Sequence, residues 1–483
     1  MAPAKHSLFK ASRGTVFLLL FCLLSACFFQ LICSKSSPLY PDNDWVDVQC
    51  FSTVGRAMLD GKILYRDIYE QKGPLVYFFH AAAAWISDEN MLGVFILTVP
   101  LVALFLFINA QLLRLMGAKN GFCACAVVIL AFFTHVLPCF AHGGSVEEIS
   151  LWLISAALYI VVRTAKDERY FSKRSCFLLG LIAGITLFSK FTFTGLFLGL
   201  ALWLAVWYIR EKEYRKLASS IFWFFFGIAC IALPIILYFA FAQALPDFFT
   251  AYFYNNLFLY RNMDQENGIS SLRIPCILLL FAAACLLWRK FRVPRCGKLF
   301  FAVLCSITTL AIAVYWGHPF LYYDLIFLPY AVFVLVPLIR FVPDVPKRAS
   351  GIALAGLLAL SCYASSNTYL LHYQKQQLPA YRFAEHIRRA ETPTLLNYGF
   401  LDGGFYRAAG VMPSNKYFCT LNIPLPQMLE EQQMILAEGR VDFVVTRNEQ
   451  LDLPHYTCVD TTAFPFEDVN QTYYLYQRIT PDE

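Results

Sequence analysis

About eleven stretches of the chain are apolar over the length that an α-helix needs to cross a bilayer. Roughly 20 mostly apolar residues span the hydrocarbon core, and in lipid only helices and closed barrels satisfy every backbone polar group. The predicted spans are 15–33, 91–113, 122–138, 146–162, 175–189, 191–209, 217–242, 274–288, 299–314, 325–339 and 350–366. We therefore predict an α-helical polytopic membrane protein.

The scarcity of charge supports this fold class. Charged residues make up 15% of the 483 residues, whereas a typical soluble domain carries roughly 25%. Such a chain lacks the polar residues needed to cover its apolar surface in water. This composition excludes an ordinary soluble enzyme, a disordered chain and a nucleic-acid-binding protein.

The basic residues indicate the orientation of the spans. Loops that fall on one side of the membrane, together with the N-terminus, hold 22 of the 39 Lys and Arg residues. Because cytoplasmic loops are enriched in Lys and Arg, we predict a multi-pass protein of the plasma membrane with a cytoplasmic N-terminus. The net charge of +6 then reflects this sorting rather than a polyanionic partner. The first span is longer than a signal-peptide core, so we interpret it as an uncleaved anchor.

Residues 175–209 test this orientation. Basic loops flank both ends of the stretch, so an even number of crossings keeps both loops in the cytoplasm. We therefore predict a helical hairpin with Lys190 at its outer turn. If the hairpin were one span, every later segment would change sides.

The first outer loop, residues 34–90, contains two predicted helices. Trp45, Val48, Phe51, Val54 and Met58 recur at spacings of three and four, which indicates an amphipathic helix that ends near 60–61. A second helix is predicted from Pro74, a favourable first helical position, through Trp85. Taken alone, the loop could be two helices at the membrane interface with solvated carboxylates.

The composition changes near Tyr369, so we predict a membrane domain over 1–368 and an extracytoplasmic α/β domain over 369–483. Strands are expected at 394–398, 441–446 and 472–478, and a helix at 426–437. Four polar side chains of this domain either contact an acceptor or serve packing and turns: Tyr398, Asp402, Tyr406 and Arg407.

The outer loop resembles the GT-C superfamily of polytopic glycosyltransferases, in particular the bacterial branch of protein O-mannosyltransferases and lipid A aminoarabinose transferases. The matching residues, in order, are Asp47, Phe51, Gly55, Arg56, Met58, Leu59, Gly61, Tyr65, Asp67, Glu70, Lys72, Gly73 and Pro74. Weaker similarities lie at 142–148, with the sequence HGGSVEE, at 188–190 and at the Tyr322-Tyr323 pair. The match covers about thirty residues.

The resemblance implies an inverting transfer of a sugar from a polyprenyl-phosphate donor on the outer face of the membrane. The acceptor, a lipid, glycan or protein, would lose its hydroxyl proton to a carboxylate. Asp47 aligns with the family's catalytic acid, and Asp44 is the alternative. Asp42 and Asp44 also form a DxD pair, so a divalent cation stays open, although no cofactor is required for this donor class.

The candidate substrate-binding residues are charged or aromatic groups on the outer side. They are Asp67, Glu70, Lys72, Glu147, Glu148, Lys190, Arg261, Arg273, His318 and Tyr323. Asp67 and Glu70 either line the acceptor site or pair with Arg66 and Lys72. Lys190, Arg261 and Arg273 either clamp a phosphate or extend to the interface. Glu147 and Glu148 either act at membrane depth or begin a helix in the headgroup region.

Two other kinds of protein remain as alternatives. A transporter or flippase would usually show internal repeats, and none stands out. A non-catalytic partner in envelope polysaccharide synthesis would tolerate loss of the acid, but Asp47 is present. Most of the 16 cysteines lie within predicted spans, and a Cys419–Cys458 bridge outside the membrane is left open.

Overall fold

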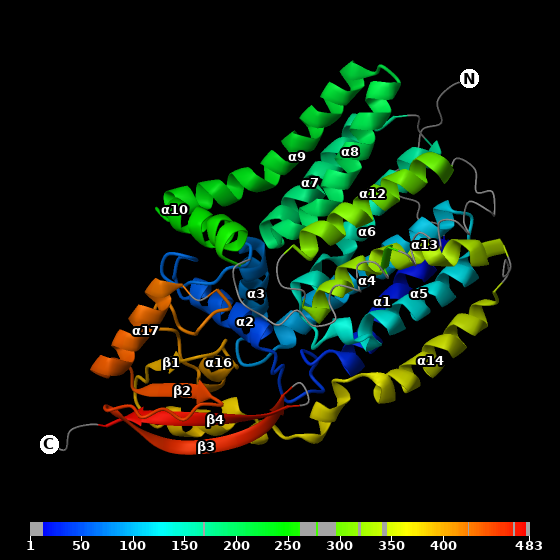
Figure 1. Ribbon diagram of the computed structural model, residues 1–483. Coiled ribbons are helices and arrows are strands. Elements are labelled where there is room, and N and C mark those ends of the chain that lie inside the picture. The colour runs from blue at the N-terminus through cyan, green and yellow to red at the C-terminus, as the bar shows by residue number, and fades with distance from the viewer. Residues whose placement is uncertain are drawn as a thin grey trace.

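The computed structural model describes residues 13–167, 170–260, 277–278, 296–316, 320–340, 345–423, 425–466 and 469–479. Long helices form one end of the molecule, and a small sheet forms the other (Figure 1). The membrane-domain helices are α1 (Arg13–Cys33), α4 (Leu92–Leu115), α5 (Asn120–Val136), α6 (Val146–Asp167), α7 (Lys173–Ser189), α8 (Gly195–Arg210), α9 (Tyr214–Phe241), α12 (Cys296–Val314) and α14 (Lys347–Ala364).

Within the described residues, six helical segments are long and apolar enough to cross a membrane. They are 13–33, 92–115, 146–166, 191–210, 214–241 and 321–339. The other predicted spans that fall in this part of the chain also form helices, although shorter or less apolar ones. The predicted span 274–288 lies outside the described residues except for 277–278.

The hairpin prediction is confirmed by a break in the helix. Helix α7 ends at Ser189, Lys190 adopts an extended conformation, and a short 3-10 helix, η2 (Phe191–Thr194), leads into α8. Glycines bring α8 close to α12, because a Cβ on Gly199 would lie 2.3 Å from the Cys305 carbonyl oxygen. Lys190 therefore sits in a turn between two helices.

The predicted span 325–339 is not a regular α-helix. It consists of a 3-10 helix, η5 (Leu321–Ala331), one turn of α-helix, α13 (Val332–Leu335), and a second 3-10 helix, η6 (Val336–Arg340). Pro329 lies inside η5 and Pro337 inside η6. Proline lacks the N–H group that donates the hydrogen bond of an α-helix, so two backbone donors are missing within this span.

Both outer-loop helices are present as α2 (Val46–Leu59) and α3 (Pro74–Ile86). They lie between the helical bundle and the sheet (Figure 1). Helix α2 crosses α3 at Gly55, where a Cβ would lie 2.6 Å from the Ala81 nitrogen. Most of α2 is buried, including Gln49 and Thr53. This differs from the expectation of a solvated interfacial helix, because the C-terminal region covers α2.

The segment after α9 is also helical. It contains α10 (Leu245–Phe248) and a π-helix, η3 (Phe249–Leu259). Tyr252 of η3 is buried and donates a hydrogen bond of 2.5 Å to the Leu187 carbonyl oxygen at the end of α7. The segment thus packs back onto the hairpin.

The C-terminal region forms a four-stranded sheet in the order β1-β2-β4-β3. The strands are β1 (Leu395–Asn397), β2 (Phe443–Arg447), β3 (Tyr456–Phe466) and β4 (Val469–Arg478); β1 and β2 are parallel, and the other pairs are antiparallel. The accompanying helices are α15 (Pro379–Ile387), α16 (Phe405–Ala409) and α17 (Pro426–Glu438). The three predicted strands and the predicted helix are confirmed. Strand β3 was not predicted, because Asp460 and Pro465 interrupt its apolar alternation.

Candidate active site

Asp47 lies in the first turn of α2, where the sequence prepares the helix start. The Asn43 side chain accepts a hydrogen bond of 3.1 Å from the Trp45 nitrogen and donates one of 3.0 Å to the Gly143 carbonyl oxygen. Asp47 is 8% exposed. Tyr322 of η5 donates a hydrogen bond of 3.2 Å from its hydroxyl to Asp47 Oδ2. The Asp47 carboxylate is thereby held by a phenol.

Lys190 is a buried cation near this carboxylate. Its Nζ lies 2.5 Å from Glu147 Oε1, in the first turn of α6, and 3.3 Å from the centre of the Tyr323 ring. Burial lowers the pKa of Lys190 to about 8, although Glu147 opposes the shift. Lys190 thus loses its proton more easily than an exposed lysine does.

Lys72 is the second cation of the site and comes from the loop before α3. Among the described residues, its ammonium forms no salt bridge of 4.0 Å or less. Burial opposes its charge, but Asp47 and Glu70 raise the pKa of Lys72 above its ordinary value. Lys72 therefore stays protonated and available to an anion.

Glu70 shapes the loop that carries Lys72. Its Oε2 accepts hydrogen bonds from the backbone nitrogens of Gln71, at 2.7 Å, and Lys72, at 2.8 Å. Burial raises the pKa of Glu70. The Lys72 carbonyl oxygen in turn accepts a hydrogen bond of 2.6 Å from the Tyr65 hydroxyl.

One backbone contact joins the Lys72 and Lys190 segments. The Gly73 nitrogen donates a hydrogen bond of 3.1 Å to the Ser189 carbonyl oxygen. A Cβ on Gly73 would lie 2.2 Å from the Phe188 carbonyl oxygen. Only glycine allows the two segments to come this close.

A cavity of about 300 Å³, which we call the lysine cavity, opens beside these two cations. Its polar lining includes Lys72, Lys190, Tyr260 and Tyr323. Its apolar lining comes from the hairpin, η3 and the end of α12: Phe191, Leu198, Tyr252, Leu257, Ala313, Val314 and Trp316. The cavity combines two ammonium groups with an apolar wall built by membrane helices.

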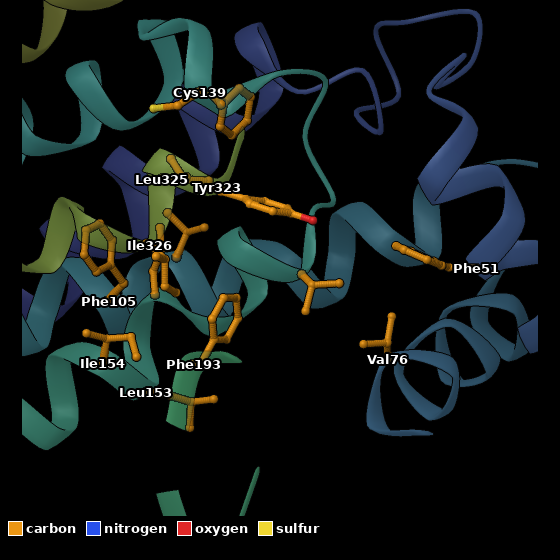
Figure 2. Packing of buried hydrophobic residues seen from close by; sticks show 14 of the residues in the cluster. Phe51, Val76, Phe105, Cys139, Leu153, Ile154, Phe193, Tyr323, Leu325 and Ile326 are labelled. Atoms are coloured by element: carbon orange, nitrogen blue, oxygen red, sulfur yellow. The ribbon is translucent and has the colours of Figure 1, made fainter. Parts of the chain in front are cut away.

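A second cavity of about 550 Å³, which we call the aspartate cavity, lies toward the C-terminal sheet. Asp47 lines it, together with Lys35, Trp45, His142, Tyr322, Asn367, Tyr369, Asn422, Arg447 and Phe466. Tyr322 lines this cavity and Tyr323 the lysine cavity; their rings are 4.9 Å apart and almost perpendicular. Tyr323 projects its hydroxyl from the apolar bundle toward α2 and α3 (Figure 2). The tyrosine pair thus marks the boundary between the cavities.

Asp44 and Asp42 have other partners. Asp44 pairs with Lys35 at 2.7 Å, and Asp42 pairs with Arg407 of α16 at 2.5 Å. In the part of the chain that the structure describes, no group of three or more His, Cys, Asp or Glu side chains could hold a metal ion. The two carboxylates of the DxD pair therefore bind cations of the protein itself.

Glu147 and Glu148 have different partners in the structure. Glu148 Oε2 accepts a hydrogen bond of 2.6 Å from the Gly144 nitrogen, and its other oxygen contacts Gln30. Glu148 thus stabilises the start of α6, whereas Glu147 faces Lys190.

The remaining candidates lie elsewhere. Asp67 pairs with Arg66 at 2.8 Å, and this contact lowers the pKa of Asp67. Glu70 instead lies in the charged network around Lys72. Arg261, Arg273 and His318 lie outside the described residues.

The C-terminal region also holds α2 and the segment before it through buried polar contacts. Arg407 is 4% exposed and donates to both Asp42 oxygens at 2.5 Å and to Gln49 Oε1 at 3.1 Å. Thr53 donates a hydrogen bond of 2.6 Å to Asp402 Oδ2. Asp402, Tyr406 and Arg407 are buried, so these three serve packing rather than direct acceptor contact.

The sequence did not single out several residues around Asp47. Tyr322 was noticed only as part of a doublet, and Trp45, Lys35 and Tyr260 were not site candidates. The position of Lys35 directly after an apolar span was the available signal. The Cys419–Cys458 bridge that the sequence left open is not formed, because Cys419 faces Cys50 and Cys458 is exposed on β3.

The comparisons with known proteins identify the fold. No family model and no curated protein matches the sequence. The structure is similar to that of ArnT from Cupriavidus metallidurans bound to undecaprenyl phosphate, with a TM-score of 0.60 and 13% identity over 96% of this chain and 98% of that chain. The apo state of the same protein gives a TM-score of 0.58 at the same identity and coverage. The chain is therefore a multi-pass membrane protein that shares the fold of ArnT.

Proposed function

We propose that this protein is a membrane glycosyltransferase that moves a sugar from a polyprenyl-phosphate donor to an acceptor hydroxyl on the outer face of the membrane. One observation carries the proposal. Asp47 lines a polar cavity that adjoins a second cavity holding two ammonium groups against apolar membrane helices. A two-substrate transfer between a lipid phosphate and a polar acceptor needs this arrangement.

The lysine cavity would bind the donor. Lys72 and Lys190 would contact the phosphate, because ammonium groups form strong charge-assisted hydrogen bonds with phosphate oxygens. The apolar wall would receive the first isoprene units. The similar ArnT structure contains undecaprenyl phosphate, which supports a lipid donor of this class. An arriving phosphate would also favour the charged form of Lys190.

The aspartate cavity would bind the acceptor. In the transfer, the acceptor oxygen attacks the anomeric carbon while Asp47 takes the hydroxyl proton. The bond between that carbon and the phosphate oxygen breaks, and polyprenyl phosphate leaves. Lys72 and Lys190 would stabilise the charge on the leaving phosphate. A single displacement of this kind inverts the anomeric configuration.

The surrounding contacts assign distinct parts to the acidic residues. Tyr322 donates to Asp47 Oδ2 and would leave the other oxygen free for the acceptor proton. Asp44 would orient Lys35 rather than act as the base, because the two form a salt bridge of 2.7 Å. We propose no resident metal; transfer measured with and without a chelator tests this directly.

The test is transfer by the purified full-length protein with a panel of polyprenyl-phosphate sugars and extracts of the cell envelope as acceptor. Asp47→Asn should lower transfer about 10²- to 10⁴-fold, the usual contribution of a general base. Asp60→Asn is a matched control, since Asp60 is exposed at the other end of α2. Wild-type transfer by Asp47→Asn would falsify the assignment of the base. Lipid movement without sugar transfer would instead indicate a flippase.

A further inference from the structure

Two cysteines from distant parts of the chain face each other one helical turn from Asp47. Cys50 lies on α2, and Cys419 lies in the C-terminal region between α16 and α17. Their sulfur atoms are 3.8 Å apart, and each residue is 1% exposed. A disulfide bond is about 2.05 Å long, so a side-chain movement of roughly 2 Å would join the two sulfurs.

We infer that Cys50 and Cys419 form a disulfide that ties α2 to the C-terminal domain. The inference rests on the outward topology of the proposed function. Disulfides form and persist in extracytoplasmic compartments, whereas cytosolic thiols are kept reduced. Both cysteines belong to segments that this topology places outside.

The reaction is a thiol–disulfide exchange with an oxidised dithiol protein of that compartment. One cysteine attacks the carrier's disulfide, whose S–S bond breaks, and forms a mixed disulfide. The second cysteine then attacks this mixed disulfide. The Cys50–Cys419 bond forms, the carrier leaves as a dithiol, and the two protons of the cysteines end on the carrier.

The burial of the pair places the reaction early in folding. Burial raises the pKa of both thiols, and only thiolates react. The exchange must therefore occur before the C-terminal domain closes over α2. Once formed, the bond is inaccessible to reductants in the folded protein.

The disulfide would join α2 to the C-terminal domain near the point where the Asp42–Arg407 salt bridge already connects the two parts of the chain. Cys50 lies three positions after Asp47 on α2, and Cys419 is 369 residues further along the chain. Closing so long a loop strongly restricts the unfolded chain. The disulfide would thus fix the catalytic helix one turn away from Asp47 without touching substrate.

The experiment lyses cells that have an oxidising extracytoplasmic compartment directly into denaturant containing N-ethylmaleimide, so that buried thiols are trapped as well. The full-length protein is then purified, denatured without reductant, digested and analysed by mass spectrometry. We expect a crosslinked peptide pair that contains Cys50 and Cys419 and disappears completely on reduction. Recovery of both residues as maleimide adducts would overturn the disulfide. The wild-type chain suffices, so a misfolding variant cannot obscure the result.

Cys458 separates failure of the disulfide from failure of the topology. It is exposed on β3, so a membrane-impermeant maleimide added to intact spheroplasts should label it. Labelled Cys458 with alkylated Cys50 and Cys419 contradicts the disulfide alone. If Cys458 is labelled only after the membrane is broken, both the outward topology and the disulfide are wrong. Neither outcome depends on the transfer assay.

Discussion

Two carboxylates near the start of α2, Asp47 and Asp42, have opposite surroundings. On the cavity face, Asp47 is held by a phenol and has cations nearby but none bound to it. In the segment before the helix, both oxygens of Asp42 accept hydrogen bonds from Arg407. The difference shows that burial alone does not identify a catalytic carboxylate. The unfilled hydrogen-bonding capacity beside a cavity is what distinguishes Asp47.

The same substitution at Asp42 and at Asp47 should show the largest difference between the two carboxylates. Asp42→Asn leaves Arg407 buried without its counter-charge, so we expect a loss of about 3–5 kcal/mol in the free energy of unfolding. Asp47→Asn should lower transfer about 10²- to 10⁴-fold but leave the melting temperature nearly unchanged. Thermal unfolding of both variants in detergent provides the measurement. Equal melting temperatures for the two variants would contradict the assignment of a structural role to Asp42 and a catalytic role to Asp47.

The next test concerns the cation without a salt-bridge partner. Lys72→Met should raise the KM for the polyprenyl-phosphate donor about 10- to 100-fold, since a hydrogen bond to a charged group contributes about 1.5–3 kcal/mol. The KM for the acceptor should change little. Steady-state kinetics with each substrate varied in turn decides the matter, and a change confined to the acceptor would contradict the donor assignment.

The pH dependence of transfer should report Lys190. Its pKa is about 8, and the protonated form is the one that binds phosphate. We therefore expect kcat/KM for the donor to be constant below this pH and to fall about tenfold per pH unit above it. Lys190→Arg should move this decline to higher pH, because arginine stays protonated. An unshifted decline in the arginine variant would assign the titration to another group.

The smallest effect should come from the phenol that holds Asp47. Tyr322→Phe removes one hydrogen bond, typically about 0.5–1.5 kcal/mol, so transfer should fall by only about twofold to tenfold. The rings on either side should keep their packing. A loss as large as that of Asp47→Asn would mean that Tyr322 itself handles the proton.

Local sequence patterns predicted much of this architecture. The apolar runs indicated the helices, and the basic loops indicated the hairpin that places Lys190 in a turn. The family resemblance of the stretch from Asp47 to Pro74 drew attention to one carboxylate and one cation, Asp47 and Lys72, of the candidate site. The extracytoplasmic position of the outer loop and domain, the domain boundary at 368 and the phosphate contacts of Arg261, Arg273 and His318 stay predictions.

Long-range contacts account for what the sequence did not show. Arg407 and Asp42 are 365 positions apart, so no spacing rule links them. Glu147 and Glu148 are adjacent in sequence, yet the start of α6 turns one to Lys190 and the other to Gly144. Which of two neighbouring carboxylates faces a cavity depends on the packing of helices far apart in the chain.

The contact of Gly73 with the Phe188-Ser189 backbone fixes a distance rather than a charge. Because no side chain lies between the two segments, the backbone next to Lys72 is in direct contact with the backbone next to Lys190. Any larger residue at position 73 would push these two segments apart. The placement of both lysine-bearing segments beside the lysine cavity thus depends on a residue that carries no charge.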